Sequence, residues 1–209
     1  MHPSLPGPAC PRGRGALGVL VDQVLSRLLN GPSMTSRWHV LALLFAVRLS
    51  MSFQFQSVAS VSPAMMQLHH VGLADIGFLI GLYLAPGLVF ALPGGALGRQ
   101  FGDKRIVVTG LGLMIIGGLL MALVPSWPWQ VAGRIIAGTG GVLLNVLMSK
   151  MVTDWFAGKE LATAMAIFVN SWPAGIALCL FVLPGVAAAQ GVPAAFLVAS
   201  GFCGLGLIA

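Results

Sequence analysis

Two arginines stand inside long apolar segments of this 209-residue chain, where a charge is energetically unfavourable. Arg48 lies ten residues into the apolar segment that begins at Trp38, and Arg134 lies five residues into the segment that begins at Trp129. A guanidinium is planar and always charged, and its fork of N–H donors matches the two oxygens of a carboxylate or another planar oxyanion. The pattern therefore favours the binding of a small anion over covalent catalysis.

Polar and small residues accompany each arginine at helical spacing. Arg48 is followed at intervals of four residues by Ser52 and Gln56, which places all three on one helix face. Arg134 shares a face with Asn145 and with two glycines between them, which either let a neighbouring helix approach or leave room for a ligand. We expect the following residues to line a binding site for a small molecule: Arg48, Ser52, Gln56, Tyr83, Arg134, Asn145, Asn170 and Trp172.

Membrane-spanning helices are the elements that must position these residues. The chain is 57% hydrophobic and only 8% charged, against roughly 25% charged residues in a soluble domain, so the composition excludes both a soluble fold and disorder. A spanning helix takes about 20 residues. We predict an all-α membrane protein with a disordered tail over 1–37 and a helical bundle over 38–209. We expect the chain to end at or within the sixth span of this bundle. The predicted spans are 38–61, 76–97, 105–124, 129–151, 161–183 and 193–209.

The basic residues predict the orientation of the bundle. If the N-terminus is cytoplasmic, the outer connections at 62–75, 125–128 and 184–192 contain no Lys or Arg. This is the positive-inside pattern, so the net charge of +6 marks topology and not nucleic-acid binding. We expect a multi-pass protein of the inner or plasma membrane. The basic residues on the inner side are Arg12, Arg14, Arg27, Arg37, Arg99, Lys104, Arg105, Lys150 and Lys159.

The acidic residues all lie outside the predicted spans. Asp22, Asp75, Asp103, Asp154 and Glu160 fall in the tail or in connections. The two arginines inside the spans then create a positive field, which a small anion would neutralise. The alternative is that both arginines donate to backbone carbonyls or pair with carboxylates outside this chain. We find no cluster that would bind a metal, no cofactor motif, and no arrangement of Ser, Cys and His typical of an enzyme.

Two motifs resemble signatures of one family. The connection between the second and third spans reads Gly95-Ala-Leu-Gly-Arg-Gln-Phe-Gly102-Asp-Lys-Arg105, and the fourth span contains Arg134-Ile-Ile-Ala-Gly138-Thr-Gly140-Gly141. Both are similar to motifs of the major facilitator superfamily, whose members have twelve helices in two six-helix halves. Residues 35–209 resemble the N-terminal half, and the form of the loop is closest to cyanate and nitrate-type porters.

The resemblance implies a conformational role for the loop between the second and third spans. At the position of Arg99 the family usually has an acid, so the gating role of that acid does not carry over directly, although Asp103 is close enough to substitute for it. The residues to which we carry the role over are Gly95, Arg99, Gly102, Asp103, Lys104 and Arg105.

The resemblance also implies a function and an internal symmetry. It implies a secondary transporter that works by alternating access and carries a small anionic solute, such as cyanate or another small oxyanion or carboxylate. The six spans would form two inverted three-helix repeats, in which Arg48 corresponds to Arg134 and Pro86 to Pro173. The partners would be the solute, the lipid bilayer, and a missing C-terminal six-helix half or a second copy, with no nucleic acid.

Two other functions stay open at this stage. One is a non-transporting membrane protein, either a truncated remnant or an interaction subunit, because one half alone does not enclose a path between two halves. The other is a porter of the same family for a neutral or cationic solute.

The predicted orientation is testable by labelling single cysteines. In a background without the three native cysteines, a cysteine at Gln67 should react with a membrane-impermeant maleimide added outside intact cells. A cysteine at Gln100 should react only after the membrane is permeabilised, because the positive-inside pattern places that loop in the cytoplasm. The opposite labelling pattern would show that the topology is inverted.

Overall fold

The computed structural model describes residues 34–90, 103–158 and 160–208, and every regular element in these ranges is a helix. Five helices are long and apolar enough to cross a membrane, and one further apolar helix is shorter. This confirms the all-helical membrane fold that the composition predicts. The helices are α2 (Met34–Ser60), α3 (Ser62–His69), α4 (Leu73–Leu82), α6 (Asp103–Leu123), α7 (Trp127–Trp155), α8 (Leu161–Gln190) and α9 (Val192–Ile208).

Several helices extend beyond the predicted spans. Helix α8 continues to Gln190 through Pro184, so the predicted outer connection 184–192 shrinks to little more than Gly191. Helix α4 begins at Leu73, because the backbone N–H of Gly72 donates to the Asp75 carboxylate at 2.9 Å and caps the first turn. Our placement of Asp75 in a connection is therefore wrong. Asp154 likewise belongs to the last turn of α7.

The first span begins earlier than predicted, and part of the predicted tail and loop lies outside the described residues. Residues 34–37, which we assigned to the tail, form the first turn of α2. The rest of the predicted tail, residues 1–33, lies outside the described residues. The same holds for residues 91–102, which include the loop positions Gly95, Arg99 and Gly102.

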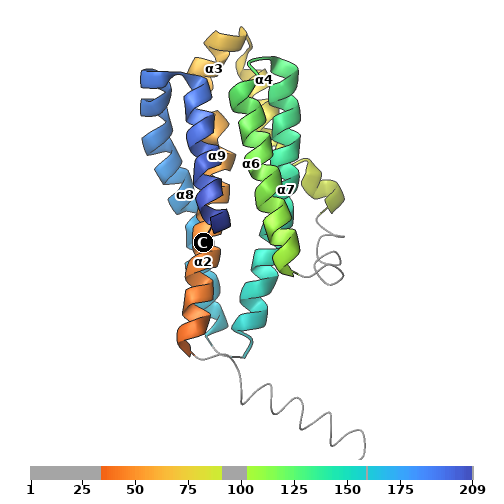
Figure 1. Cartoon of the computed structure of the whole chain (residues 1–209), viewed down its shortest axis with the longest axis vertical. Coiled ribbons are helices and arrows are strands. Elements are labelled where there is room, and N and C mark those ends of the chain that lie inside the picture. The colour runs from red at the N-terminus through yellow and green to blue at the C-terminus, as the bar shows by residue number, and fades with distance from the viewer. Residues whose placement is uncertain (1–33, 91–102, 159, 209) are drawn as a thin grey trace, which may run out of the picture. The chain divides into compact units, whose positions relative to one another are not determined.

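The helices of the unit Arg37–Ala209 run side by side as a bundle (Figure 1). Helix α3 lies at the end of the bundle where α6 turns into α7 and α8 turns into α9, at the top of Figure 1. The connection between α7 and α8 lies at the opposite end. This arrangement agrees with the prediction that the three connections without Lys or Arg share one side of the membrane.

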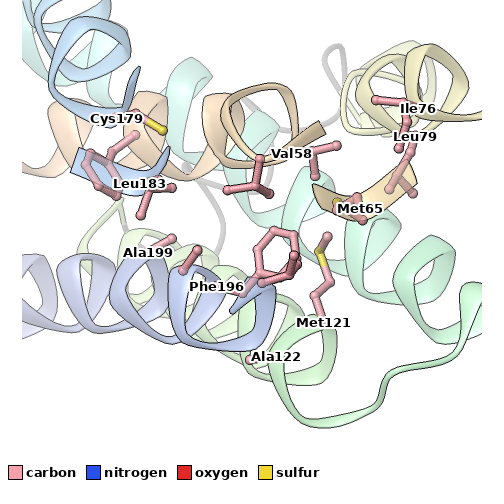
Figure 2. Close-up of a cluster of buried hydrophobic side chains, with 14 residues drawn as sticks. Val58, Met65, Ile76, Leu79, Met121, Ala122, Cys179, Leu183, Phe196 and Ala199 are labelled. Atoms are coloured by element: carbon pink, nitrogen blue, oxygen red, sulfur yellow. The ribbon is translucent and has the colours of Figure 1, made fainter. Parts of the chain in front are cut away.

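Two clusters of buried apolar side chains hold the bundle together, one towards each end. In the first, residues from α2, α3, α4, α6, α8 and α9 meet around Phe196, which is 1% exposed (Figure 2). The second joins α2, α6, α7, α8 and α9 around Met114, Met148 and Phe168. Because lipid is as apolar as these side chains, close packing rather than exclusion of water stabilises such clusters in a bilayer.

Glycines bring α6 and α7 into backbone contact at two levels. A Cβ atom on Gly117 would lie 2.5 Å from the Gly133 carbonyl oxygen, and one on Gly133 would lie 2.7 Å from the Gly117 carbonyl oxygen. At the second level, a Cβ on Gly110 would lie 3.0 Å from the Gly140 carbonyl oxygen. The absence of side chains at these positions allows the two helices to approach closely. It fixes the position of α7, which carries Arg134.

Substitution of Gly117 should test this contact. We expect Gly117→Ala to lower the free energy of unfolding by about 1–3 kcal/mol, because the new Cβ pushes against backbone that does not yield. Gly112→Ala, on the same helix with nothing within 4 Å of its Cβ position, is the matched control and should be neutral or slightly stabilising. Unfolding in mixed micelles, followed by circular dichroism, measures both. Equal effects of the two changes would contradict the contact.

Candidate functional site

Arg134 is fully buried, and its guanidinium is bonded to the backbones of two other helices. Its Nε donates to the Leu79 carbonyl at 3.3 Å, and its two Nη atoms donate to the carbonyls of Gln54, at 3.2 Å, and Phe55. Its exposed fraction is 0%. The arginine therefore ties α7 to α2 and α4. Of the two roles that the sequence left open, this geometry favours the one in which Arg134 donates to backbone carbonyls.

The Leu79 carbonyl accepts from Arg134 because the second span is interrupted. Helix α4 ends at Leu82, and the chain becomes helical again at Pro86. In the break, the N–H of Tyr83 bonds to the Ile80 carbonyl at 3.3 Å, which leaves the Leu79 carbonyl without its usual donor four residues on. Pro86 has no N–H to continue the helix. The second span is therefore broken just before Pro86, whereas α8 stays helical through Pro173.

The glycine face of α7 accommodates Tyr83. A Cβ on Gly138 would lie 2.9 Å from the Tyr83 Cα, and one on Gly141 would lie 2.8 Å from its Cζ. Tyr83 is 2% exposed, and its ring centroid lies 4.8 Å from the Cζ of Arg134. These two glycines therefore serve close approach and do not leave room for a ligand. Tyr83 lies at the predicted site as a packing partner of Arg134.

Gln54 joins the same network and was not among the predicted site residues. Its side-chain Nε2 donates to the Met114 carbonyl at 2.7 Å, and its Oε1 accepts from the Cys203 thiol at 3.2 Å. Its own carbonyl accepts from Arg134. Because its side chain is 2% exposed, Gln54 links α2 to α6, α7 and α9 in the interior. An amide inside an apolar segment, two residues before the predicted Gln56, was the signal in the sequence that could have identified it.

Arg48 differs from Arg134 in its burial and in its hydrogen bonding. It is half-buried, and in the part of the chain that the structure describes its buried Nε has no hydrogen-bond partner. Its guanidinium lies over aromatic rings of α8, with Cζ 4.3 Å from the centroid of Phe168 and 5.8 Å from that of Trp172. Arg48 stands near the middle of the span Arg37–Ser60. It is a cation at mid-span whose buried Nε is not engaged by the described residues.

Helix α8 reaches Arg48 because Gly175 lets it pack closely on α2. A Cβ on Gly175 would lie 2.5 Å from the Leu49 carbonyl oxygen. Ser52 is fully buried at this contact, and its hydroxyl donates to the Leu49 carbonyl at 2.9 Å and to the Ser171 carbonyl at 3.4 Å. Ser52 therefore belongs to the interface between α2 and α8. It lies one turn from Arg48 but does not present a free donor beside it.

A chain of aromatic rings connects the two arginines. Phe55 lies 5.4 Å from Trp172 and 5.3 Å from Tyr83, measured between ring centroids. Trp172 stands beside Arg48, and Tyr83 beside Arg134. Phe55 and Trp172 are half-buried, so part of each ring stays accessible. The sequence predicted Tyr83 and Trp172 but missed Phe55 and Phe168, whose spacings of seven from Arg48 and four from Trp172 are compatible with shared helix faces.

The other predicted site residues are exposed or half-buried and are not part of the aromatic chain between the two arginines. Asn145 is exposed, and Asn170 is exposed with its Nδ2 donating to the Ala166 carbonyl at 2.9 Å. Gln56 is half-buried on α2. Of the loop motif, Asp103 and Lys104 begin α6 and Arg105 is exposed in its first turn.

The charges and titratable groups outside the spans suggest no second site. The described carboxylates of Asp75, Asp154 and Glu160 are exposed at helix ends, and Asp154 lies 3.9 Å from the Lys150 ammonium. His69, in α3, has its ring centroid 5.9 Å from that of Trp127, and burial lowers its pKa. Among the described residues, no three His, Cys, Asp or Glu side chains form a group that could hold a metal.

Replacement of Arg134 should destabilise the bundle. We expect Arg134→Gln to lower the free energy of unfolding by about 2–4 kcal/mol, because the Leu79 carbonyl loses its donor and the space beside Tyr83 is left partly empty. Arg134→Lys should also be destabilising, since one ammonium does not reach three carbonyls in the same geometry. Denaturation in mixed micelles followed by circular dichroism measures both. A stable Arg134→Gln protein would show that the carbonyl contacts are dispensable.

Comparison with known proteins places this arrangement in a family. Residues 43–209 match the family model described as Major Facilitator Superfamily. The human choline/ethanolamine transporter FLVCR2 is 28% identical over 151 residues, which cover 71% of this chain and 29% of the relative. An uncharacterized transporter of Buchnera aphidicola is 37% identical over 67 residues, covering 32% of this chain and 17% of the relative.

Solved structures show the same fold. The inward-open xylose transporter XylE from E. coli superposes with a TM-score of 0.73 at 15% identity, over 82% of this chain and 46% of that protein. A peptide transporter POT in complex with sulfate gives a TM-score of 0.69 at 19% identity, over 80% of this chain and 36% of that protein. The chain spans less than half the length of each of these proteins. Because the family model matches well over half of its residues, the chain belongs to the Major Facilitator Superfamily.

Proposed function

We propose that this chain is part of a secondary transporter for a small anionic solute, and that Arg48 binds the anionic group. The observation that carries the proposal is the state of this one guanidinium. It stands near the middle of a span, lies half-buried over Phe168, and has a buried Nε without a partner among the described residues. A charge in such a place is energetically unfavourable unless a counter-ion or water reaches it, which is why intramembrane charges mark transport pathways.

The surrounding charges support an anion. The described carboxylates lie exposed at helix ends, away from the mid-span position of Arg48. The second cation within a span, Arg134, is linked to Arg48 through the rings of Tyr83, Phe55 and Trp172. Its positive charge is not neutralised by the carbonyls that accept its hydrogen bonds. The local field is therefore positive, and a planar oxyanion or carboxylate would fit the guanidinium fork.

The transport cycle we propose is alternating access around Arg48. In this scheme the path across the membrane lies between this bundle and a second one, either a C-terminal six-helix half or another copy of the chain. In this scheme the protein lies in the inner or plasma membrane, and its N-terminus faces the cytoplasm. Because the described acids are not near mid-span, proton coupling would use the solute itself or the other bundle, and uniport or anion exchange are the simpler modes.

A cationic solute is the second candidate, since the relative FLVCR2 is named a choline/ethanolamine transporter. Accessible aromatic rings can bind quaternary ammonium groups through cation–π contacts, and Phe55 and Trp172 are half-buried. The nearby rings, however, already face guanidinium groups of the protein: Phe168 and Trp172 face Arg48, and Tyr83 and Phe55 face Arg134. A further cation would be repelled by both, so the anionic solute is favoured.

Anion binding by the purified chain in nanodiscs tests the proposal. We expect Arg48→Gln to weaken the binding of acetate and related carboxylates about 100-fold, because hydrogen bonds to a charged group contribute roughly 1.5–3 kcal/mol. Arg48→Lys should weaken it about tenfold, since it keeps the charge and loses the planar fork. Isothermal titration calorimetry gives the affinities.

Two controls separate binding from folding. Arg37→Gln removes a guanidinium from the first turns of the same helix and should leave the affinity unchanged. Arg48→Gln itself should retain the thermal stability of the parent protein, in contrast to Arg134→Gln. Full anion binding by Arg48→Gln, or tight binding of choline by the parent protein without competition from anions, would refute the proposed function.

A further inference from the structure

Two of the polar side chains expected to help Arg48 hold a small inorganic oxyanion are already engaged with backbone carbonyls. The hydroxyl of Ser52 donates to backbone carbonyls of α2 and α8, and the Nδ2 of Asn170 donates to the Ala166 carbonyl of its own helix. An inorganic oxyanion loses a full shell of water on binding and needs several donors in return. Besides the indole N–H of Trp172, the donor group at this position is the Arg48 guanidinium itself. Its fork satisfies two oxygens, which is the requirement of a carboxylate.

The surface next to this fork is aromatic. Phe168 covers one side of the guanidinium and is itself fully buried. Trp172 and Phe55, with centroids 5.4 Å apart, are half-buried and continue the apolar surface beyond it. Tyr83, at the far end, is buried and does not add accessible area. A ligand that reaches Arg48 therefore meets one cationic fork and two partly accessible rings.

We infer that the solute is an organic monocarboxylate whose planar or apolar body packs against Trp172 and Phe55 while its carboxylate binds Arg48. This inference rests on the proposed function and specifies the substrate class of the same site. The fork supplies the orientation, and the rings supply contact area and the preferred geometry of aromatic pairs. The same arrangement disfavours nitrate, cyanate and other inorganic anions, which have no body to place on the rings.

The experiment compares four probes that separate the fork from the body. Phenylacetate has both, acetate has the carboxylate alone, nitrate is a planar inorganic oxyanion, and 2-phenylethanol has the body without the charge. Affinities of the 209-residue chain in nanodiscs are measured by calorimetry. We expect phenylacetate to bind at least tenfold more tightly than each of the other three.

Variants then assign the two contributions to residues. Trp172→Ala should weaken phenylacetate about tenfold and leave acetate unchanged, and Phe55→Leu, which keeps an apolar side chain in α2, should have the same selective effect. Arg48→Gln should reduce phenylacetate to the affinity of 2-phenylethanol. Trp129→Ala is the matched control, because Trp129 is 49% exposed at the start of α7 and outside this group.

The outcomes distinguish this inference from the proposed function. If acetate or nitrate binds as tightly as phenylacetate and Arg48→Gln abolishes the binding, the anionic site stands and the monocarboxylate inference is overturned. If 2-phenylethanol binds as tightly as phenylacetate and Arg48→Gln has no effect, both fail. The absence of Arg48-dependent binding by any probe would also overturn both. Phenylacetate selectivity that disappears in Trp172→Ala and in Phe55→Leu, but not in Trp129→Ala, supports the inference.

Discussion

The bundle depends on one buried guanidinium that is bonded to the backbone of two neighbouring helices. Arg134 contributes donors to carbonyls of Leu79, Gln54 and Phe55. Backbone carbonyls in the hydrocarbon region have no bulk water to bond, so a break in a helix is tolerated where another donor satisfies the freed group. The interruption of the second span at Tyr83 to Ala85 provides such a group, and Arg134 satisfies it. The arginine and the helix break therefore require one another.

The glycines of α6 and α7 follow from the same constraint. For the short fork of Arg134 to reach α2 and α4 together, α7 must lie very close to the break. Gly138 and Gly141 give that proximity on the side of Tyr83, and Gly133 and Gly140 give it on the side of α6. Gln54 completes the interior by joining α2 to α6 and α9 through Met114 and Cys203. Polar groups in the described interior thus connect helices that are far apart in the sequence. Apolar contacts alone would fix the relative positions of these helices less specifically.

The sequence predicted the architecture well, because length, hydropathy and charge asymmetry are physical requirements of a membrane span. It placed Arg48 and Trp172 in one site, and the structure brings their side chains together. It did not predict the helix ends, because a membrane helix continues past its apolar run: Asp75 caps α4 from within its first turn, and α8 passes through Pro184. Nor could it tell ligand space from close packing at Gly138 and Gly141. That distinction depends on which residue of another helix lies opposite.

Arg48 and Arg134 look equivalent in sequence, yet the helices that their guanidinium groups face are different. Each lies within a span, and each is accompanied by small or polar residues at helical spacing. Arg134 faces a broken helix, where a carbonyl lacks its usual intrahelical donor. Arg48 faces α8, which stays helical from Leu161 to Gln190. Its guanidinium lies over the rings of Phe168 and Trp172, and its buried Nε has no hydrogen-bond partner among the described residues.

A ring face compensates a guanidinium only partly. A cation–π contact contributes on the order of 0.5–2 kcal/mol, whereas desolvation of a charge costs several kcal/mol. The deficit at Arg48 persists as long as its buried Nε lacks an acceptor among the described residues. An arginine that contributed only to packing would be replaced by an apolar side chain with a gain in stability. Under the proposed function, a ligand removes this deficit when it binds. This difference in environment, and not the residue type, separates the structural arginine from the one we assign to the solute.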